Sequence, residues 1–254
     1  MQKNPSKKPD YSNWVSSRFI YIPWVISLLF VGLSFVLPAF LIIGILFLLI
    51  TLYFTYAYYR FSPRGGNIQR QIQAMLLSHL DWDGEGKAVD IGCGNAPLSI
   101  MLSQKYPAAQ VTGIDYWGEM WDYSKRVCES NAQIEGVAER VVFQKASASK
   151  LPFEDGAFDA AVSNLVFHEV GDTKDKRELI HEALRVVKKG GKFAFQDLFL
   201  EQKTFGKTDE LLALIRSWGI TRVEFDRTCD APFIPRSLKL PFMVGTIGVL
   251  YGEK

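Results

Sequence analysis

The sequence predicts an α/β protein in which two apolar helices precede a parallel sheet that is covered by helices on both faces. Three observations lead to this fold class. Residues 19–59 contain no charged side chain. From Asn67 onward, short apolar runs alternate with amphipathic stretches, and such alternation is typical of a parallel sheet with crossover helices. A glycine-containing turn, residues 92–94, lies between the first predicted strand and the helix that follows it.

The uncharged run is about twice as long as one membrane-spanning helix. Hydrocarbon about 30 Å thick needs roughly 20 helical residues. Pro38 divides the run into residues 19–37 and 39–59, and a turn is favoured there because proline lacks the N–H that a continuing helix would use. We therefore expect a cytoplasmic N-terminal tail over residues 1–18 and a transmembrane helical hairpin over residues 19–59.

Basic side chains flank the run on both sides: Lys3, Lys7, Lys8 and Arg18 before it, and Arg60, Arg64 and Arg70 after it. The positive-inside tendency places both flanks in the cytoplasm, which requires an even number of crossings. A cleavable signal peptide is disfavoured because its apolar core has only about 7–15 residues. A single kinked span and a hairpin that enters one leaflet remain open. No acid or base lies inside the run, so we expect an anchor and not a transport pathway.

Strands and helices alternate through residues 60–254, the predicted soluble domain. Strands are predicted at residues 87–92, 109–116, 140–146, 158–167, 191–199, 221–227 and 245–254. Helices are predicted at residues 67–80, 97–106, 119–136, 175–189 and 208–219, and Gly190 and Gly191 are expected to end the fourth of these. The apolar segment 228–244 carries Arg236 and Lys239. We interpret this segment as a packed crossover or lid, or as a loop that touches a membrane surface.

Charge and cysteine content restrict the partners. The net charge of +2 neither favours nor excludes a nucleic-acid partner. Because the sequence has no basic stripe, we expect no such partner. The three cysteines are widely spaced, without a CxxC pair or paired histidines. This pattern favours reduced thiols over a disulfide framework or a metal site.

The stretch AVDIGCGNAP, residues 88–97, places Gly92 and Gly94 between a strand and a helix. Glycines there permit a tight turn and a close approach of the backbone to a ligand. Asp115 ends the next strand, the position from which a carboxylate binds both hydroxyls of a ribose. Asp90 precedes the glycines, and Ala96 stands where a dinucleotide-binding turn would have a third glycine. A carboxylate at this place disfavours a phosphate and suits a ligand with a cationic amino-acid end, such as S-adenosylmethionine.

The stretches VDIGCG, GIDY, LPFEDGAFDAAVSN and ALRVVKKGGKFAFQD resemble, in order and spacing, the successive motifs of class I S-adenosylmethionine-dependent methyltransferases. The resemblance covers about residues 67–200. It implies a Rossmann-like seven-stranded sheet whose last strand is antiparallel. It also implies that S-adenosylmethionine is the cofactor.

Cofactor-binding residues follow from this resemblance by motif. Asp90, Gly92 and Gly94 would surround the methionine end, Asp115 would bind the ribose, and Tyr116 would lie against the adenine. The family often has an acid after the third strand for the adenine amino group. Ser147 stands there instead, so the contact would pass to its hydroxyl or to the backbone. Asn164, at the end of the fourth strand, is a further candidate for a polar contact with the cofactor.

The stretch SNLVFHEV lies beside the donor methyl group in the family that this sequence resembles, and it contains the candidate catalytic residues. His168 could deprotonate a hydroxyl, thiol or amine near neutral pH. Glu169 is the second candidate base, and Asp197, at the end of the fifth strand, is a third. The alternative is that His168 only packs or caps in this loop and that alignment of the reactants suffices for methyl transfer.

The sequence thus predicts a membrane-anchored methyltransferase that acts on a small or lipid-like acceptor at oxygen, sulfur or nitrogen. No DPPY-type or NPPY-type signature of amino methylation is present. One alternative is a catalytically silent module that binds the cofactor while the hairpin acts in a complex. Another is a nicotinamide-dependent oxidoreductase, which Asp90 and Ala96 disfavour. The oligomeric state stays open.

Overall fold

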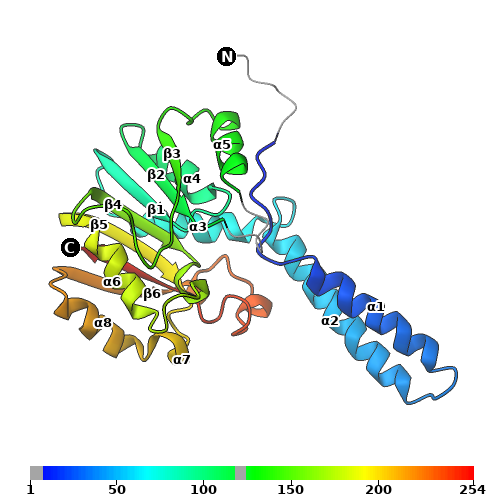
Figure 1. The fold of residues 1–254 in the computed structure, drawn as a ribbon. Coiled ribbons are helices and arrows are strands. Elements are labelled where there is room, and N and C mark those ends of the chain that lie inside the picture. The colour runs from blue at the N-terminus through cyan, green and yellow to red at the C-terminus, as the bar shows by residue number, and fades with distance from the viewer. Residues whose placement is uncertain (1–7, 118–123) are drawn as a thin grey trace. The chain divides into compact units, whose positions relative to one another are not determined.

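The computed structural model describes residues 8–117 and 124–254, which fall into two compact units. Ser12–Ile72 form one unit, and Gln73–Lys254 with the described residues up to Tyr11 form the other. Figure 1 shows the elements of both. The basic residues Lys3 and Lys7 and the first part of the helix predicted over residues 119–136 lie outside the described residues.

The first unit contains two antiparallel helices, α1 (Arg18–Leu33) and α2 (Phe40–Phe61). Ring contacts pair Phe19 with Phe54, and Phe30 with Phe40, which fixes the antiparallel register. At the middle, the Ser27 hydroxyl donates a hydrogen bond to the Gly44 carbonyl oxygen (2.8 Å). A Cβ atom on Gly44 would lie 2.8 Å from a methyl group of Val31, so glycine is needed for this close helix packing.

The turn of this helical hairpin contains Pro38, as expected, but the first helix ends earlier than predicted. It ends at Leu33 and not at residue 37. The Ser34 hydroxyl donates to the Val31 carbonyl oxygen (2.6 Å), and the backbone N–H of Val36 donates to the Leu33 carbonyl oxygen (3.0 Å). These contacts satisfy helix-end carbonyls, so the turn begins before the proline.

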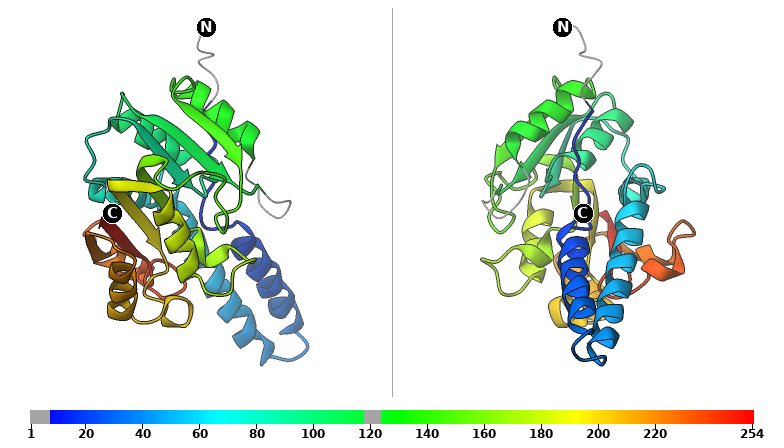
Figure 2. Two further views of the ribbon diagram at one scale, coloured as in Figure 1. Left: turned by 60° about the vertical axis from the view of Figure 1, so that its left-hand side comes forward. Right: turned by 90° about the vertical axis from the view of Figure 1, so that its right-hand side faces the viewer.

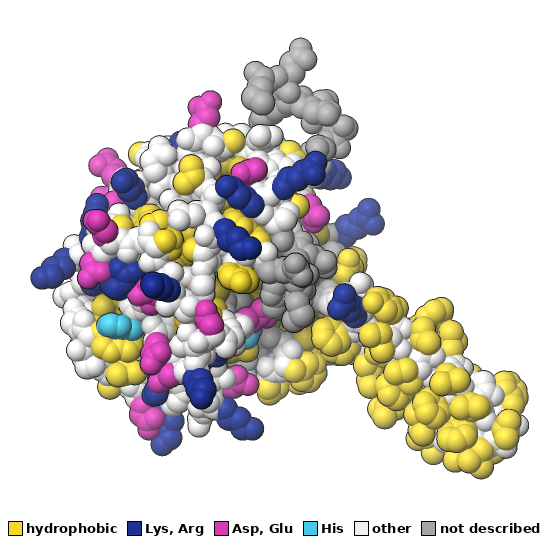
Figure 3. Space-filling model, in the orientation of Figure 1, with side chains coloured by type: hydrophobic (Ala, Val, Ile, Leu, Met, Phe, Trp, Pro, Cys, Tyr) yellow, Lys and Arg dark blue, Asp and Glu magenta, His cyan; other side chains and the backbone are white. Residues whose placement is uncertain are grey.

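Among the residues that the structure describes, one helix, α2, is long and apolar enough to cross a membrane, and α1 is a shorter apolar helix. Many of their large apolar side chains are exposed. Figure 3 shows hydrophobic side chains gathered over α1 and α2, whereas charged side chains are scattered over the other unit.

The second unit contains a seven-stranded sheet in the order β3-β2-β1-β4-β5-β7-β6. Its strands are β1 (Lys87–Ile91), β2 (Gln110–Asp115), β3 (Val141–Lys145), β4 (Phe158–Asn164), β5 (Val187–Asp197), β6 (Arg222–Arg227) and β7 (Gly248–Glu253). β1 to β5 pair in parallel, and β7 runs antiparallel to both β5 and β6. The predicted seven-stranded sheet with an antiparallel last strand is confirmed.

Helices cover both faces of the sheet (Figure 1, Figure 2). They are α3 (Ile68–His79), α4 (Pro97–Lys105), α5 (Lys125–Ile134), α6 (Arg177–Arg185), α7 (Gln202–Phe205) and α8 (Thr208–Ser217), with short 3-10 turns η1 (Phe167–Glu169), η2 (Thr228–Asp230) and η3 (Arg236–Leu238). Buried side chains of α4 and α5 form one hydrophobic core, and those of α6, α7 and α8 form the other. This two-faced burial explains the nearly continuous apolar runs of the central strands.

The boundary between α6 and β5 differs from the prediction. The helix ends at Arg185, and residues 187–191 already belong to β5 instead of ending a helix. Val187 is fully buried. The register between β4 and β5 shifts between the pair Phe158–Val187 and the pair Ala160–Lys192. Gly190, with φ +76°, lies within this irregular part of β5. Burial of Val187 against the core overrides the helical pattern of the sequence.

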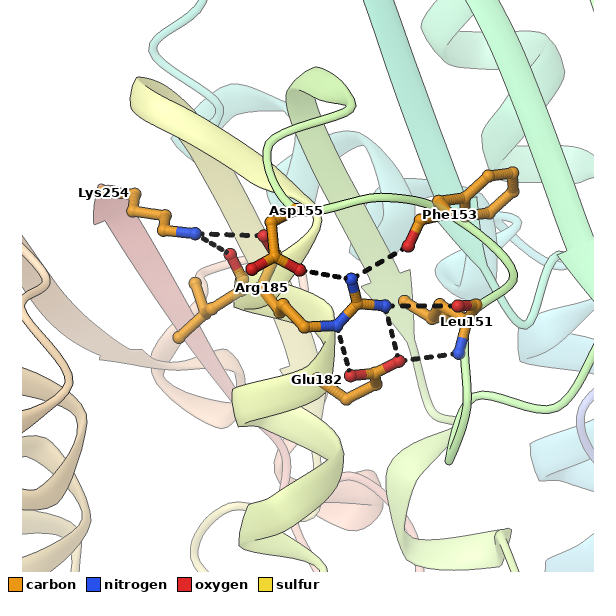
Figure 4. Close-up of polar contacts among 7 residues, drawn as sticks. Leu151, Phe153, Asp155, Glu182, Arg185 and Lys254 are labelled. Carbon is orange, nitrogen blue, oxygen red and sulfur yellow. Dashed lines mark hydrogen bonds and ion pairs between the residues drawn. The ribbon is translucent and has the colours of Figure 1, made fainter.

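The LPFEDG stretch before β4 is held to α6 by the Arg185 guanidinium (Figure 4). Arg185 donates to Glu182 (2.8 and 2.9 Å), to Asp155 (2.7 Å) and to the carbonyl oxygens of Phe153 and Leu151. Hydrogen bonds to Glu182 and Asp155 hold the pKa of Arg185 above its ordinary value. The motif therefore orients the chain as it enters β4, the strand that leads to the candidate site.

Candidate functional site

The candidate site lies at the carboxyl ends of β1, β2, β4 and β5. These strands are parallel, so their carboxyl ends meet at one edge of the sheet. Three non-glycine residues with positive φ, namely Ala96, Trp117 and Leu165, follow β1, β2 and β4 at this edge. Such backbone conformations cost free energy and tend to cluster at functional sites.

The glycine-containing loop after β1 is tied to the end of β2. The backbone N–H groups of Gly92 and Cys93 both donate to the Ile114 carbonyl oxygen (2.8 and 2.9 Å). Gly92 has φ +73°, and a Cβ atom there would lie 2.1 Å from a methyl group of Val166, which follows β4. Glycine at this position thus permits both the turn and the close approach of the β4 loop.

We expect Gly92→Ala to lower the free energy of unfolding by about 2 kcal/mol, because the methyl group must occupy a left-handed conformation and also displace Val166. Chemical denaturation measures this change. The matched control is Gly190→Ala, since Gly190 has φ +76° but no atom within 4 Å of its added Cβ. Equal losses of unfolding free energy in the two variants would show that the left-handed backbone conformation alone, without the Val166 contact, requires glycine at position 92.

Asp115 ends β2 and binds the loop from the other side. Its two carboxylate oxygens accept hydrogen bonds from the N–H groups of Gly94 and Trp117, each at 2.9 Å. Burial raises the pKa of Asp115, while these backbone hydrogen bonds act in the opposite direction. Each oxygen keeps a lone pair, so the carboxylate can accept from two ribose hydroxyls while it holds the loop.

Asp90 is fully buried beneath the loop. One carboxylate oxygen accepts a hydrogen bond from the Ser99 hydroxyl (2.5 Å). Burial raises the pKa of Asp90 to about 7, although the bond from Ser99 lowers it. A cationic group near the second oxygen would favour the ionised form. The side chain thus suits a ligand with a positive charge and does not suit a phosphate.

Unsatisfied buried atoms test whether these residues fit the expected cofactor. Within residues 8–117 and 124–254, the second carboxylate oxygen of Asp90 and the amide oxygen of Asn164 are buried without a hydrogen-bond partner. Buried polar atoms are normally paired. Both oxygens could accept a hydrogen bond from the ammonium group of a ligand at the ends of β1 and β4. S-Adenosylmethionine has such a group, so these residues fit it.

The residues expected at the adenine are Tyr116 and Ser147. Tyr116 directly follows Asp115, is 64% exposed, and has the Lys145 ammonium 5.1 Å from its ring centroid. The Ser147 hydroxyl donates to the Asp172 carboxylate (3.1 Å), which also accepts from Ser149 (2.7 Å). The connection between β4 and α6 thus brings a carboxylate to the place where the sequence lacks one. Sequence reasoning missed Asp172 because only the fold brings it close to Ser147.

The two candidate bases of the β4 loop differ in their surroundings. His168 Nδ1 lies 2.6 Å from an Asp197 carboxylate oxygen, and its Nε2 lies 3.6 Å from Glu169. Asp197 is fully buried and also accepts the backbone N–H groups of Val166, Phe167 and Leu198. With its oxygens facing these donors, Asp197 is placed to orient the imidazole, whereas His168 Nε2 is the nitrogen left for proton transfer.

Glu169 connects the two halves of the site electrostatically. Its negative charge is one of the influences that raise the pKa of Asp115. For His168, burial lowers the pKa, but hydrogen bonding to Asp197 and Glu169 outweighs it and raises the pKa to about 9. Glu169 therefore acts electrostatically both on the imidazole of His168 and on the predicted ribose-binding carboxylate of Asp115.

The His168–Asp197 pair should make stability depend on pH. The folded-state pKa of about 9 lies above the ordinary value of about 6.5, so the folded state binds this proton more tightly. The pair's contribution, about 2 kcal/mol after a discount for partial exposure, is complete below about pH 6.5. It declines as the pH rises and is lost above about pH 9.

Urea denaturation of the wild-type protein and of His168→Gln at pH 6, 8 and 10 measures this contribution as the difference between the two. His79→Gln is the matched control, since His79 also contacts a carboxylate, Asp226, at 2.8 Å. A difference for His168→Gln that stays constant from pH 6 to 10 would contradict the raised pKa.

The comparisons with known proteins agree on the type of domain. Residues 89–195 match the family model described as a methyltransferase domain. The ubiquinone/menaquinone biosynthesis C-methyltransferase of Desulfotalea psychrophila is 28% identical over 109 residues, which cover 43% of this chain and 40% of that protein. The demethylmenaquinone methyltransferase of Thermus thermophilus is 32% identical over 106 residues, which cover 42% and 44%. The chain thus spans less than half the length of these two curated relatives.

A solved structure with a similar fold is the geranyl diphosphate C-methyltransferase from Streptomyces coelicolor A3(2), in complex with Mg2+, geranyl diphosphate and S-adenosyl-L-homocysteine. It has a TM-score of 0.56 and 14% sequence identity, and the match covers 75% of this chain and 80% of that one. At this identity, the likeness supports the fold alone.

Proposed function

We propose that this chain methylates a small, lipophilic acceptor at a membrane. The chain carries a class I S-adenosylmethionine-dependent methyltransferase domain, with S-adenosylmethionine as its cofactor. The observation that carries the choice of acceptor chemistry is the His168–Asp197 pair at the ends of β4 and β5. An oriented imidazole is needed for an acceptor that must lose a proton, such as a phenol, an enol or an amine.

The roles of the residues follow from their contacts. The bound cofactor supplies an electrophilic methyl group on a sulfonium. Asp115 and Asp90 would hold its ribose and its amino-acid end. Neutral His168 takes the acceptor's proton on Nε2 while Asp197 keeps the proton on Nδ1. The deprotonated acceptor would take the methyl group of the cofactor with the neutral thioether as leaving group, and His168 would later release its proton to water.

The names of the relatives extend the set of proposed acceptor atoms beyond the oxygen, sulfur or nitrogen expected from the sequence. By name, the Desulfotalea relative is a C-methyltransferase of ubiquinone/menaquinone biosynthesis, and the Thermus relative is a demethylmenaquinone methyltransferase. Loss of a phenolic proton makes both the oxygen and the neighbouring ring carbon nucleophilic. One base at His168 therefore serves O- and C-methylation, and we include carbon among the proposed acceptor atoms.

Incubation of the full-length protein with membrane and soluble extracts and a methyl-labelled cofactor tests this activity. We expect labelled product in the lipid-soluble fraction, identified by untargeted mass spectrometry. Cofactor binding without consumption in any extract would overturn the enzyme proposal and favour the catalytically silent binding module. Label confined to polar metabolites would overturn the lipophilic acceptor.

Anchoring by α1 and α2 is the second part of the proposal. It is supported by the length and apolar character of α2, the exposed apolar side chains of both helices, and the basic residues on both flanks. We propose that the hairpin spans the bilayer twice and that the methyltransferase domain is cytoplasmic. The exposed turn between the helices would then lie on the far side.

Thiol labelling tests this topology, since the three native cysteines are buried. Phe35, 91% exposed in the turn, and Val142, 61% exposed on β3, are replaced singly by cysteine. In sealed vesicles with the domain outside, an impermeant maleimide should label Val142→Cys but not Phe35→Cys. With the domain inside, Phe35→Cys should react. Protection of Phe35→Cys from both sides would indicate a hairpin that enters one leaflet.

A further inference from the structure

In the connection between β6 and β7, the one acid, Asp230, lies in η2, and residues 231–247 after it form a segment with two cations and no acidic residue. Its side chains divide into two groups. Ile234, Leu238 and Val244 are buried, at 4%, 0% and 1% exposure, and anchor the segment to the domain. Leu240 and Phe242 are 38% and 65% exposed, and Pro241 between them is also exposed. The segment therefore has a packed base and an apolar tip.

Backbone contacts hold the tip in one conformation. The N–H groups of Met243 and Gly245 both donate to the Leu240 carbonyl oxygen (2.9 and 3.0 Å), and the Thr246 hydroxyl donates to the Pro241 carbonyl oxygen (3.1 Å). A Cβ atom on Gly245 would lie 2.5 Å from the Lys239 carbonyl oxygen, so the turn closes tightly on itself. These hydrogen bonds fix the conformation of the exposed apolar tip, so little conformational entropy is lost when the tip binds a partner.

Basic side chains accompany the apolar tip. Arg236 lies in η3, and Lys239 directly precedes Leu240. Neither forms a salt bridge with a carboxylate of the described residues. Aromatic and aliphatic side chains beside cations are typical of segments that enter the headgroup region of anionic membranes. Lipid phosphates would accept from the cations while the tip leaves water.

We propose that the tip Leu240–Pro241–Phe242, together with Arg236 and Lys239, binds the surface of a bilayer that contains anionic lipids. The proposal rests on the anchoring by α1 and α2, which keeps the methyltransferase domain within reach of the bilayer. The occupant is the lipid surface because exposed apolar side chains stand beside two cations, Arg236 and Lys239, and this combination is complementary to an anionic bilayer surface.

An environment-sensitive dye on Phe242→Cys tests the contact in the full-length protein. The protein is reconstituted into protein-free vesicles of zwitterionic lipid, with or without about one third anionic lipid. The matched control is the same dye on Val142→Cys, an apolar position of similar exposure, 61%, on β3. With anionic lipid, we expect the emission of the Phe242 dye to shift to shorter wavelength and to be quenched by a lipid-bound quencher, with no change at position 142.

Charge reversal and flotation separate the possible failures. Arg236→Glu with Lys239→Glu should abolish the shift, and high salt should reduce it, while the protein still floats with the vesicles. Flotation without any shift would overturn the surface contact but leave the anchor intact. Loss of flotation would overturn the anchor itself. A shift that occurs in native membranes but not in protein-free vesicles would indicate a protein partner and would also overturn the proposal.

Discussion

Asp115→Asn should weaken the binding of S-adenosylmethionine by about 30- to 1,000-fold, because two hydrogen bonds from ribose hydroxyls to a carboxylate are worth roughly 2–4 kcal/mol together. The substitution also disturbs the loop. Both oxygens of Asp115 face backbone N–H donors, at Gly94 and Trp117. In the asparagine variant, the amide NH2 group would face one of these two N–H donors and could not accept its hydrogen bond. Isothermal titration calorimetry on the full-length protein measures the affinity.

Asp159→Asn is the matched control for this prediction. Asp159 lies at the start of β4, the opposite edge of the sheet from the end of β2, and it also accepts a backbone N–H, from Lys87 (2.8 Å). The control should keep full affinity even if it loses some stability. Unchanged affinity in Asp115→Asn would remove Asp115 from the cofactor site.

His168→Gln should lower turnover by about 100- to 10,000-fold, the usual contribution of general base catalysis, while the affinity for the cofactor changes little. The imidazole acts as a base only when neutral, and its pKa is about 9. The wild-type rate should therefore rise about tenfold per pH unit through neutral pH and level off near pH 9. Single-turnover rates with a methyl-labelled cofactor, measured from pH 6 to 10, check this.

The His79→Gln variant controls for the loss of a histidine–carboxylate contact elsewhere, and it should retain the wild-type rate and pH profile. A wild-type rate that falls above pH 9 would mean that imidazolium, not imidazole, is the working form. Unchanged turnover in His168→Gln would leave alignment of the reactants as the whole mechanism.

The parts of the fold that follow from local pattern could be predicted from the sequence. Gly92, Gly94 and Asp115 lie at or just after the carboxyl ends of predicted strands, and parallel strands end at one edge of the sheet, so their proximity could be foreseen. The end of α6 could not be foreseen, because residues 186–189 continue a helical pattern that burial in the β5 register overrides. The first apolar helix ends before Pro38 because the Ser34 hydroxyl and the following turn satisfy its last carbonyl groups.

The candidate site was only partly predictable because it depends on pairs of residues far apart in the chain. His168 and Asp197 appeared as separate candidates for a base, whereas the structure joins them and gives Asp197 three backbone N–H partners besides. Asp172 reaches Ser147 across 25 residues, and no local signal marks it. The functional roles of these residues remain predictions for the experiments above.

The place of β7 in the sheet has a consequence for the order in which the chain is assembled. β7 follows β6 in the chain, yet it lies between β5 and β6 and pairs with both. During synthesis, β6 can therefore join the sheet only once residues 248–253 have left the ribosome, and until then the edge of β5 stays open. An unpaired edge is prone to wrong pairing. Nascent chains that stall within the β6–β7 connection should therefore depend on chaperones more than chains released after β7.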